Sequence, residues 1–451
     1  MDKNTLLKNI NTELKSKPLI FFTREAERAL GLEDELENYH ICCIQDDYYY
    51  RSLKSKGISI FSLEAESGSL DISSTSKLLS HNLVIEWIKS TTNDNGFYGQ
   101  IFFPSSVSKF KIEKLGGTYI NNDPEICKNI ENKFWFDDFL KEKRINKIPS
   151  LITRIDEVEY TDLDDSFGSE FVIQEDRGHT GSGTHLIKNE DQYNLLREKL
   201  GGNQVKFSKV INGDTFTLNV VVGKNENFIG PIQYQITGIR ELTPGLYSTV
   251  GNDFISGPEL PTQIKHSILM VSDKLANELN KIGYQGLFGI DLILDSNSIY
   301  IIEVNARQTA NIPFQTYLEN DQIEQPTQNM LNLALALGIN IDEYASNYKH
   351  VPNIKGAQVF LRSFEDNYVV KNNNKSGIYN YNASKSSYNW VREGYSIKDI
   401  ESNSELMLSS QKKGSTKSKY EEILRVQIKD SVITEGKVRD DILNFIKELK
   451  D

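Results

Sequence analysis

The chain has 451 residues and a mass of 51.4 kDa, which at roughly 150 residues per domain favours about three domains. Apolar residues make up 38% of the sequence and charged residues 25%, so there is enough apolar material for sizeable cores and a fully disordered chain is excluded. Acidic residues outnumber basic ones by 63 to 51, and the net charge of −12 argues against an overall basic, nucleic-acid-binding surface.

The cysteines and the first residues of the chain indicate the compartment. Cys42, Cys43 and Cys127 lack the spacing of metal ligands and give no disulfide framework, which fits a reducing compartment. Residues 1–15 are polar and charged, without the apolar segment of a signal peptide. No apolar run approaches the roughly 20 residues that a membrane span needs. We therefore expect a soluble cytoplasmic protein with neither a nucleic-acid nor a membrane partner.

Residues 1–120 alternate between short apolar runs and helical segments. Strands are expected at residues 18–22, 39–44, 57–62 and 98–103, and helices at residues 25–30, 76–89 and 106–115. Strands that alternate with helices favour a parallel sheet with helices on its faces. No Gly-x-Gly-x-x-Gly follows the first strand, so the dinucleotide-binding fingerprint is missing. The pattern predicts a Rossmann-like α/β domain.

Residues 121–340 combine helices with strands of a different kind, an α+β pattern. A long helix is predicted from Asp123 to Leu140, with Asp123 as its cap and Pro124 in its first turn. Turn signals separate strands that we expect to pair antiparallel, at residues 171–174, 185–188, 204–211 and 216–222. Helices are predicted at residues 264–282 and 322–337, and strands at 286–294 and 298–305 with a tight turn over 295–298.

The composition shifts beyond residue 338. Residues 371–375 and 409–419 are polar and are predicted to be loops, and an amphipathic helix is expected over residues 437–449. Residues 341–451 are therefore assigned to a small mixed C-terminal region. A lid, the surface of a homodimer and a part of an acceptor site are all open as its role.

Three oxygen-bearing side chains are expected to meet on the hairpin of residues 286–305. On a strand, residues i and i+2 face the same way, so Glu303 and Asn305 project together, while Asp291 lies on the preceding strand. Oxygen ligands suit Mg²⁺, which binds nucleotide phosphates beside one or two carboxylates. A hairpin with solvated polar side chains is the alternative, and the apolar flanks and the adjacent Arg307 argue against it. The pattern predicts a site for Mg²⁺, or Mn²⁺, at Asp291, Glu303 and Asn305.

A glycine-rich loop follows the strand of residues 171–174. It reads Gly178-His-Thr-Gly-Ser-Gly-Thr184, and small residues let backbone N–H groups approach a polyphosphate closely. The loop lacks the Gly-Lys-Ser/Thr ending of a P-loop, so the Walker mechanism is not supported. Taken alone, the loop could equally be a simple turn, and His179 within it could be a base or a solvated side chain.

Together and in this order, these features resemble the ATP-grasp superfamily over residues 121–337. The hairpin resembles its metal-binding hairpin, the glycine loop its phosphate-covering loop, and residues 1–120 the pre-ATP-grasp domain that commonly precedes it. Residues 207–213 resemble the segment near the adenine that links the two ATP-clamping halves, and Lys133 resembles the first nucleotide-binding lysine. The resemblance implies an ATP site formed by Lys133, Gln174, Gly181, Ser182, Gly183, Thr184, Ser208 and Lys209.

Gln174 departs from the family pattern, because many members carry a second lysine there. A glutamine can hydrogen-bond a phosphate or an adenine but brings no charge. Arg177 or Lys188 could supply the charge, or the nucleotide is bound weakly. Ser208 and Lys209 likewise stand where many relatives have glutamate.

The resemblance implies an ATP-dependent carboxylate–amine ligase. ATP would phosphorylate a carboxylate, and an amine would attack the acyl phosphate to give an amide, ADP and phosphate. Arg307 would orient the acyl phosphate or the carboxylate, and Arg240 could face either the substrate cleft or solvent, as could Gln233 and Gln235. Amino acids or small peptides are the expected substrates. A carboxylase of the biotin-dependent type and an ATP-binding interaction protein without turnover remain the alternatives.

Overall fold

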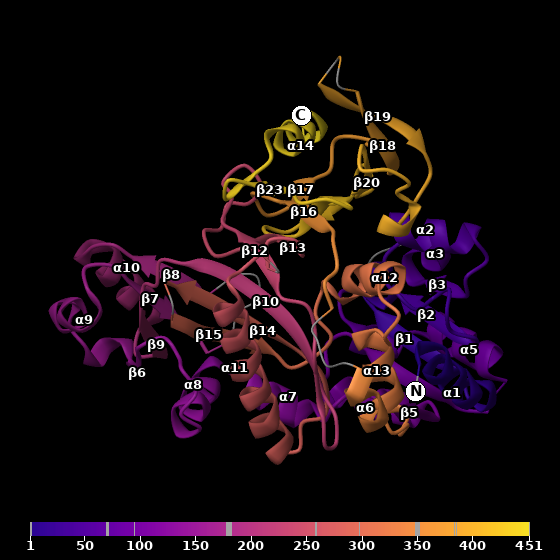
Figure 1. The fold of residues 1–451 in the computed structure, drawn as a ribbon, viewed down its shortest axis with the longest axis horizontal. Helices are drawn as coiled ribbons and strands as arrows, with labels where there is room; N and C mark the ends of the chain where they lie inside the picture. The colour runs from indigo at the N-terminus through magenta and orange to yellow at the C-terminus, as the bar shows by residue number, and fades with distance from the viewer. Residues whose placement is uncertain are drawn as a thin grey trace.

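The computed structural model describes residues 2–68, 72–93, 95–176, 183–257, 259–296, 298–347, 352–382, 384 and 386–450. Figure 1 shows the N-terminal sheet on one side of the molecule and a small four-stranded sheet on the other. A long antiparallel sheet lies between them and continues into the C-terminal part of the chain. The architecture therefore combines α/β and α+β parts, as predicted.

The N-terminal sheet is parallel throughout, with strand order β3-β2-β1-β4-β5. Its strands are β1 Leu19–Thr23, β2 Tyr39–Cys43, β3 Ile60–Ser62, β4 Phe97–Ile101 and β5 Gly117–Tyr119. The helices are α1 Lys3–Ser16, α2 Tyr48–Ser55, α3 Leu63–Ser67, α4 Thr75–Leu78, α5 Asn82–Thr92 and α6 Ser106–Lys114. The predicted Rossmann-like layer is confirmed.

Local details of this layer differ from the expectation. Helix α1 was not foreseen, although Leu6, Ile10 and Leu14 repeat every four residues and are fully buried. The helix predicted over residues 76–89 is two helices, because His81 caps the second one by accepting a hydrogen bond from the backbone N–H of Leu83. The helix predicted over residues 25–30 is one 3-10 turn, Ala26–Ala29.

The single long helix predicted from residue 123 is likewise two helices, α7 Pro124–Ile130 and α8 Lys133–Glu142. Asp123 caps α7 as expected. Asn132 interrupts the run, since its side-chain oxygen accepts hydrogen bonds from the N–H groups of Phe134 and Trp135. Such a cap stabilises a helix start by about 1 kcal/mol. Lys133 therefore stands in the first turn of α8 rather than in mid-helix.

The small sheet has the order β6-β9-β7-β8 and is antiparallel. Its strands are β6 Ser150–Arg154, β7 Phe171–Gln174, β8 Thr184–Ile187 and β9 Gln204–Lys209. One face packs on α9 Tyr160–Phe167 and α10 Glu190–Leu200 through Phe171, Ile173, Val205 and Phe207. Because side chains alternate along a strand, Val172, Gln174, Lys206 and Ser208 share the opposite face.

The large sheet runs β15-β14-β10-β12-β13-β16-β22-β20-β18-β19, with β11 at the side of β10. Its strands are β10 Asp214–Val222, β11 Asn227–Ile229, β12 Gln233–Thr237, β13 Thr249–Asp253, β14 Gly286–Asp295, β15 Ser298–Asn305, β16 Ala357–Arg362, β18 Gly377–Asn382, β19 Ser387–Arg392, β20 Glu405–Ser410 and β22 Glu422–Ile428. Helix α11 Thr262–Lys281 covers one face of its β10–β14 part. The pairing of β13 with β16 carries the sheet across residue 340 without a break.

Two helices connect the large sheet to the N-terminal layer, α12 Ile312–Gln322 and α13 Gln328–Ala336. A single helix was predicted at residues 322–337. Instead, Pro326 and the cap residue Thr327 lie between the end of α12 and the start of α13. Phe314 and Leu333 share one core with Leu19 and Phe21 of β1. The remaining described elements are the 3-10 turns Ile155–Glu157, Asp342–Asn347 and Ile397–Asp399, the strands β17 Tyr368–Val369, β21 Thr416–Lys417, β23 Ile433–Thr434 and β24 Lys437–Val438, and helix α14 Asp440–Lys450.

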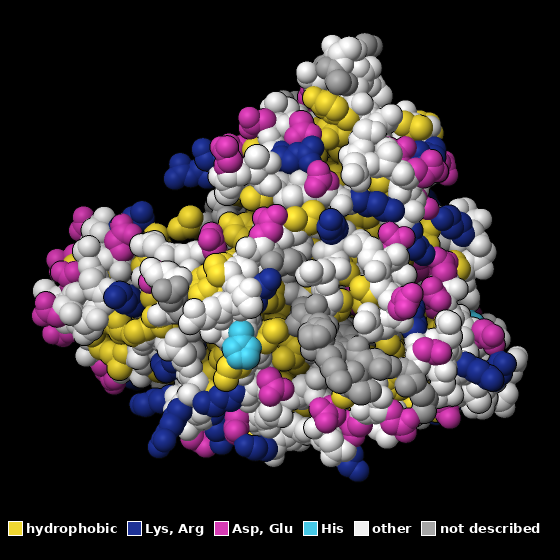
Figure 2. Space-filling model, in the orientation of Figure 1, with side chains coloured by type: hydrophobic (Ala, Val, Ile, Leu, Met, Phe, Trp, Pro, Cys, Tyr) yellow, Lys and Arg dark blue, Asp and Glu magenta, His cyan; other side chains and the backbone are white. Residues whose placement is uncertain are grey.

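The surface carries both signs of charge. Figure 2 shows acidic and basic side chains interspersed over the drawn face, so the described residues on that face form no extended basic field of the kind that nucleic-acid binding requires. No helix within the described ranges is both long and apolar enough to cross a membrane.

Candidate active site

The hairpin of β14 and β15 brings two carboxylates together. Asp291 is directly opposite Glu303, and Gly289 is opposite Asn305 in the same ladder. Gly289 leaves room here, since a Cβ at this position would clash with Thr309. Three oxygen-bearing side chains are thus gathered on one face of the paired strands, and the opposite face, with Ile290 and Val304, is buried against α11.

The carboxyl group of Asp291 is electrostatically strained. Burial and then the neighbouring charge of Glu303 raise the pKa of Asp291 to about 7, although hydrogen bonds from Thr217 and Gln235 oppose the rise. Two carboxyl groups directly opposed on one face of a sheet are the arrangement expected where a cation normally separates them. Within the described part of the chain, no group of three His, Cys, Asp or Glu side chains is placed to hold a metal. A bound Mg²⁺ would therefore use Asp291, Glu303, the Asn305 amide oxygen and water, a donor set that suits it.

Mg²⁺ binding is expected to weaken as the pH falls below about 7, because the proton and the cation compete for the Asp291 carboxyl group. In the cation-free protein, Asp291 makes stability depend on pH in the opposite sense to a carboxylate whose pKa is lowered by folding. The raised pKa makes the folded state hold the proton more tightly than the unfolded state, so stability falls as the pH rises from about 4 to about 7. Calorimetric Mg²⁺ titrations one unit below and one unit above pH 7, in buffers of different ionisation enthalpy, should show proton release mainly at the lower pH. Equal affinity and no proton release at both would contradict the assignment.

Arg307 lies immediately beside this acidic pair. Its Nη1 donates to the Asn305 side-chain oxygen at 2.9 Å and lies 3.6 Å from a carboxylate oxygen of Glu131. Its guanidinium carbon lies 4.5 Å from the centre of the Phe103 ring and 5.6 Å from that of Phe102, so the group is stacked against the N-terminal layer. The Nε–H is buried and has no hydrogen-bond partner among the described residues. Arg307 is therefore fixed in place with a donor left for an anionic group.

A cluster of lysines lies across from the hairpin. The two oxygens of Asp137 on α8 form ion pairs with Lys206 at 2.9 Å and with Lys147 at 2.7 Å. Lys147 also donates a hydrogen bond to Ser150. Burial lowers the pKa of Lys206, Asp137 opposes that shift, and the charges of Lys147 and Lys133 add to it. Lys147 forms a bridge with Ile301 of β15, two residues before Glu303, so the lysine cluster adjoins the carboxylates.

The expectation included Lys133 but missed Asp137, Lys147 and Lys206. A signal for Lys206 was available. The predicted strand of residues 204–211 carries polar side chains at alternate positions, Lys206 and Ser208, which indicates a strand with one polar face. The pairing partner of that strand could not be read from the pattern.

The base of the glycine loop lies on the same face of the small sheet. Gln174 is opposite Thr184 and donates to its hydroxyl at 3.4 Å, while the N–H of Glu175 donates to the carbonyl of Gly183. Gly183 has φ of +74°, a conformation that favours glycine. The predicted ATP-binding residues Gly181 and Ser182, together with Arg177 and His179, lie outside the described residues.

The structure places the other predicted site residues in different surroundings. Ser208 is buried on the same face as Gln174, whereas Lys209, the next residue, is exposed and projects from the other face. Lys188 was offered as a replacement charge, and this interpretation is wrong, because it pairs with Glu170 at the far end of the β7–β8 hairpin. Arg240 is exposed on the loop between β12 and β13.

Gln233 and Gln235 were open either as walls of the substrate cleft or as solvent-facing residues, and the structure places them differently. Gln235 hydrogen-bonds to Asp291. Gln233 is fully buried and accepts a hydrogen bond from Asn311, so the wall prediction is wrong for this residue. It belongs to an amide network that fixes the start of α12 behind the hairpin, since Gln315 is part of it as well.

Charged residues of both signs continue the site toward the C-terminal strands. The guanidinium carbon of Arg28 lies 5.1 Å from the centre of the Phe102 ring, which Arg307 also contacts, so the two arginines lie near each other. Burial raises the pKa of Glu422 on β22 to about 7, while the positive charges of Arg28 and Arg362 oppose that rise. Arg425 is buried and forms ion pairs with Glu422 and with Glu27. These charged residues form a junction where the N-terminal layer, the hairpin and the C-terminal strands meet.

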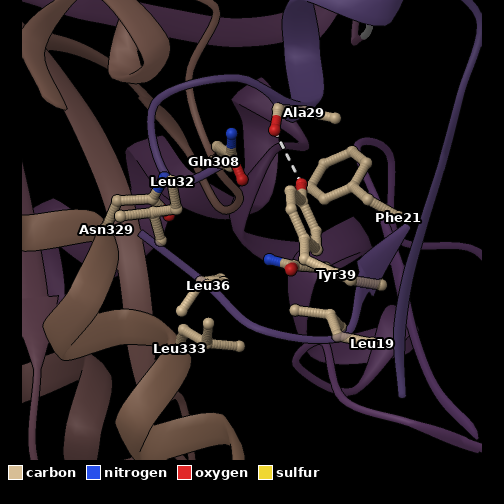
Figure 3. Close-up of a pocket in the computed structure, with 10 residues that line it drawn as sticks. Leu19, Phe21, Ala29, Leu32, Leu36, Tyr39, Gln308, Asn329 and Leu333 are labelled. Carbon is tan, nitrogen blue, oxygen red and sulfur yellow. Dashed lines mark hydrogen bonds between the residues drawn. The ribbon is translucent and has the colours of Figure 1, made fainter. Parts of the chain in front are cut away.

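Two pockets accompany these groups. One, of about 150 Å³, lies between Thr184 and Leu186 of β8, the loop of residues 244–248 and Tyr420. The other, shown in Figure 3, is of about 10 Å³ and lies between the N-terminal sheet and α13. There Tyr39 donates to the carbonyl of Ala29, and the side-chain oxygen of Gln308 is buried without a hydrogen-bond partner among the residues that the structure describes. That space accommodates about one water molecule and no substrate.

Comparison with known proteins identifies the family. Residues 130–311 match the model of the ATP-grasp domain, and the carboxylate hairpin, the glycine loop and the lysine cluster all lie within that match. Residues 130–311 are therefore an ATP-grasp domain. The predicted fold class and the prediction of an ATP-dependent ligase are thereby confirmed. No curated protein sequence matches the chain.

Solved ATP-grasp structures resemble the chain over almost its full length. The ADP complex of PurK, an N5-carboxyaminoimidazole ribonucleotide synthetase, has 11% identity and a TM-score of 0.60 over 97% of this chain and 98% of its own. N5-carboxyaminoimidazole synthase from Aspergillus clavatus, in complex with ADP and 5-aminoimidazole ribonucleotide, has 10% identity and a TM-score of 0.59 over 97% and 100%. The L-amino acid ligase from Bacillus licheniformis has 12% identity and a TM-score of 0.59 over 96% of both chains. At these identities the likeness shows the fold.

Proposed function

We propose that this ATP-grasp protein joins a carboxylate to an amine through an acyl phosphate, with an amino acid or a small peptide as the substrate. The observation that carries this proposal is the position of Arg307. A buried guanidinium, whose Nε–H has no partner within the described part of the chain, adjoins the carboxylate pair that suits Mg²⁺. Such a group can hold a substrate carboxylate, and afterwards the acyl phosphate, next to the transferring phosphoryl group.

The residues of the chain would divide the work as follows. Asp291, Glu303 and Asn305 would hold Mg²⁺, or Mn²⁺, and a bound divalent cation supplies neutralisation of the phosphate charge. Lys133 at the start of α8 would bind the phosphates from the opposite side. The loop after β7 would cover the phosphates and exclude water, which protects the acyl phosphate from hydrolysis.

The proposed reaction has two steps. A carboxylate oxygen attacks the γ-phosphorus of ATP, the bond to the β-phosphate oxygen breaks, and ADP leaves. The amine nitrogen then attacks the acyl carbon, the carbon–oxygen bond to phosphate breaks, and the nitrogen loses a proton as the amide forms. Holding both reactants in one site lowers the barrier to each step by several kcal/mol.

The mixed charge of the neighbouring junction supports a zwitterionic substrate. Arg28 and Arg362 are suited to a carboxylate, and Glu422, which is ion-paired with Arg425, supplies the negative charge, all within reach of one another's charge. Arg28 also shares the Phe102 ring with Arg307, so this junction continues directly from the proposed reaction centre. A bicarbonate substrate would not require groups of both signs. Gln174, which brings no charge to the phosphate site, is the observation that favours the second candidate, an ATP-binding interaction protein without turnover.

Release of ADP and phosphate from Mg·ATP should depend on a particular acid–amine pair. The purified protein would be incubated with single amino acids and with pairs of them, and in parallel with bicarbonate, while ADP is measured and products are identified by mass. Release with one pair, together with a product whose mass equals the sum of both less water, supports the ligase. Dependence on bicarbonate would favour the carboxylase alternative, and ATP binding without release under any condition would favour the interaction protein.

A further inference from the structure

We propose that Lys206 on β9 binds the phosphates of the nucleotide and supplies the ammonium group that Gln174 does not. The inference rests on the proposed ATP-dependent function and assigns one residue of its phosphate site. The replacement charge comes from the neighbouring strand of the sheet rather than from the glycine loop or from the residues that follow it.

The register of the small sheet places Lys206 where this charge is needed. Gln174 on β7 is directly opposite Lys206 on β9, and Thr184 on β8 is opposite Gln174 on its other side. Directly opposed residues lie on the same face of a sheet, with Cα atoms about 4.5–5.5 Å apart. Thr184, Gln174 and Lys206 therefore form one row across three strands at the base of the glycine loop. A lysine at the end of this row reaches the space that a lysine at position 174 would reach.

The charge balance of the cluster calls for an anion. Lys206, Lys147 and Lys133 are close enough to act on one another's charge, and Asp137 is the carboxylate that ion-pairs with two of them. No ion pair of the Lys133 ammonium is recorded among the described residues, and the Lys206 side chain is only 10% exposed. Three ammonium groups around one carboxylate leave about two positive charges poorly compensated in a partly desolvated site. A polyphosphate between this cluster and the cation-binding hairpin would complete the compensation.

A purely structural lysine would have a different setting. A buried charge without full compensation costs desolvation free energy, so an excess of ammonium groups over carboxylates does not favour stability. Asp137 is shared between Lys206 and Lys147, and Lys147 also donates a hydrogen bond to Ser150. Lys206 has three N–H donors, and Asp137 accepts from it on one side only, so donors remain for phosphate oxygens.

The test moves the charge from one strand to the next. Lys206→Met should raise the dissociation constant of Mg·ATP about 10- to 100-fold, because a charge-assisted contact is lost. Adding Gln174→Lys to this variant should return the constant to within about threefold of the wild-type value, since the new ammonium group enters the same row. Lys188→Met is the matched control, an exposed lysine directly after β8 that pairs with Glu170, and it should bind as the wild type does. Calorimetry on the full chain measures binding directly, and circular dichroism checks folding.

The outcomes separate this inference from the proposed function. If Lys206→Met binds Mg·ATP as tightly as the wild type, Lys206 is not a phosphate ligand, while ligation of an acid–amine pair by the wild type can still hold. If the variant is folded and weak but the double variant is equally weak, the lysine acts through Asp137 and the inference fails. It fails too if neither variant folds, since the ion pair is then structural. Wild-type protein that binds Mg·ATP without ever turning over contradicts the proposed function and leaves the assignment of Lys206 standing.

Discussion

Glu303→Gln is expected to abolish turnover while the protein stays folded. The substitution keeps the size of the side chain and removes the charge that, with Asp291, would hold the divalent cation. Loss of a charge-neutralising cation site at a transferring phosphoryl group costs several kcal/mol, so turnover should fall by about 1,000-fold or more. The same change removes the neighbouring charge that raises the pKa of Asp291, so the cation-free variant should be at least as stable as the wild type. ADP release and thermal unfolding, measured on the same preparation, check both parts.

A matched control lies on the same hairpin. Asp295 is at the turn end of β14, where it pairs with Ser298, away from the Asp291–Glu303 rung. Asp295→Asn removes an acid of the same strand and should leave turnover within a factor of about two of the wild type. Undiminished turnover in Glu303→Gln, or an equal loss in both variants, would rule out the metal assignment.

The hairpin was predictable because its chemistry follows from the period of a strand. Alternation places Glu303 and Asn305 on one side, and a β-bulge between Asp291 and Leu292 shifts the register so that Asp291 lies opposite Glu303. The parallel N-terminal layer was predictable for the same kind of reason, since each apolar run is short and is followed by a helical segment. Both features depend on local patterns.

The parts that escaped prediction depend on longer-range or finer information. The break at Asn132 is a capping contact made by one side chain within an otherwise helical run, and it moves Lys133 to a helix start. Lys206 gains its place from the pairing of β7 with β9, two strands separated in the chain by β8 and α10. Nothing in the local pattern of residues 204–211 states which strand lies alongside. The continuation of the large sheet from β13 to β16 is a pairing of the same long-range kind.

Arg307→Lys is expected to lower kcat/KM for the carboxylate substrate by about 100-fold or more, while the affinity for Mg·ATP changes little. Lysine keeps the positive charge but loses the planar fork and its Nε–H donor, so it cannot hold Asn305 and a carboxylate in the same fixed geometry. It also loses the stacking on Phe103, which holds the guanidinium 4.5 Å from the ring centre. A residue that served only to join the N-terminal layer to the hairpin would tolerate this change at a modest cost in stability. The two roles therefore predict different readouts.

Steady-state kinetics with the acid and ATP varied separately distinguish the two roles of Arg307. A substrate-orienting role requires the loss to fall on kcat and on KM of the acid, with the ATP constants nearly unchanged. Arg154→Lys provides the control. Arg154 is half-exposed, lies at the end of β6 away from the lysine cluster, and pairs with Asp156. Equal kinetics in wild type and Arg307→Lys, with a lowered melting temperature, would reduce Arg307 to a structural contact. In that case Arg28, which shares the Phe102 ring with it, and Arg362 would be the guanidinium groups at the junction suited to the carboxylate.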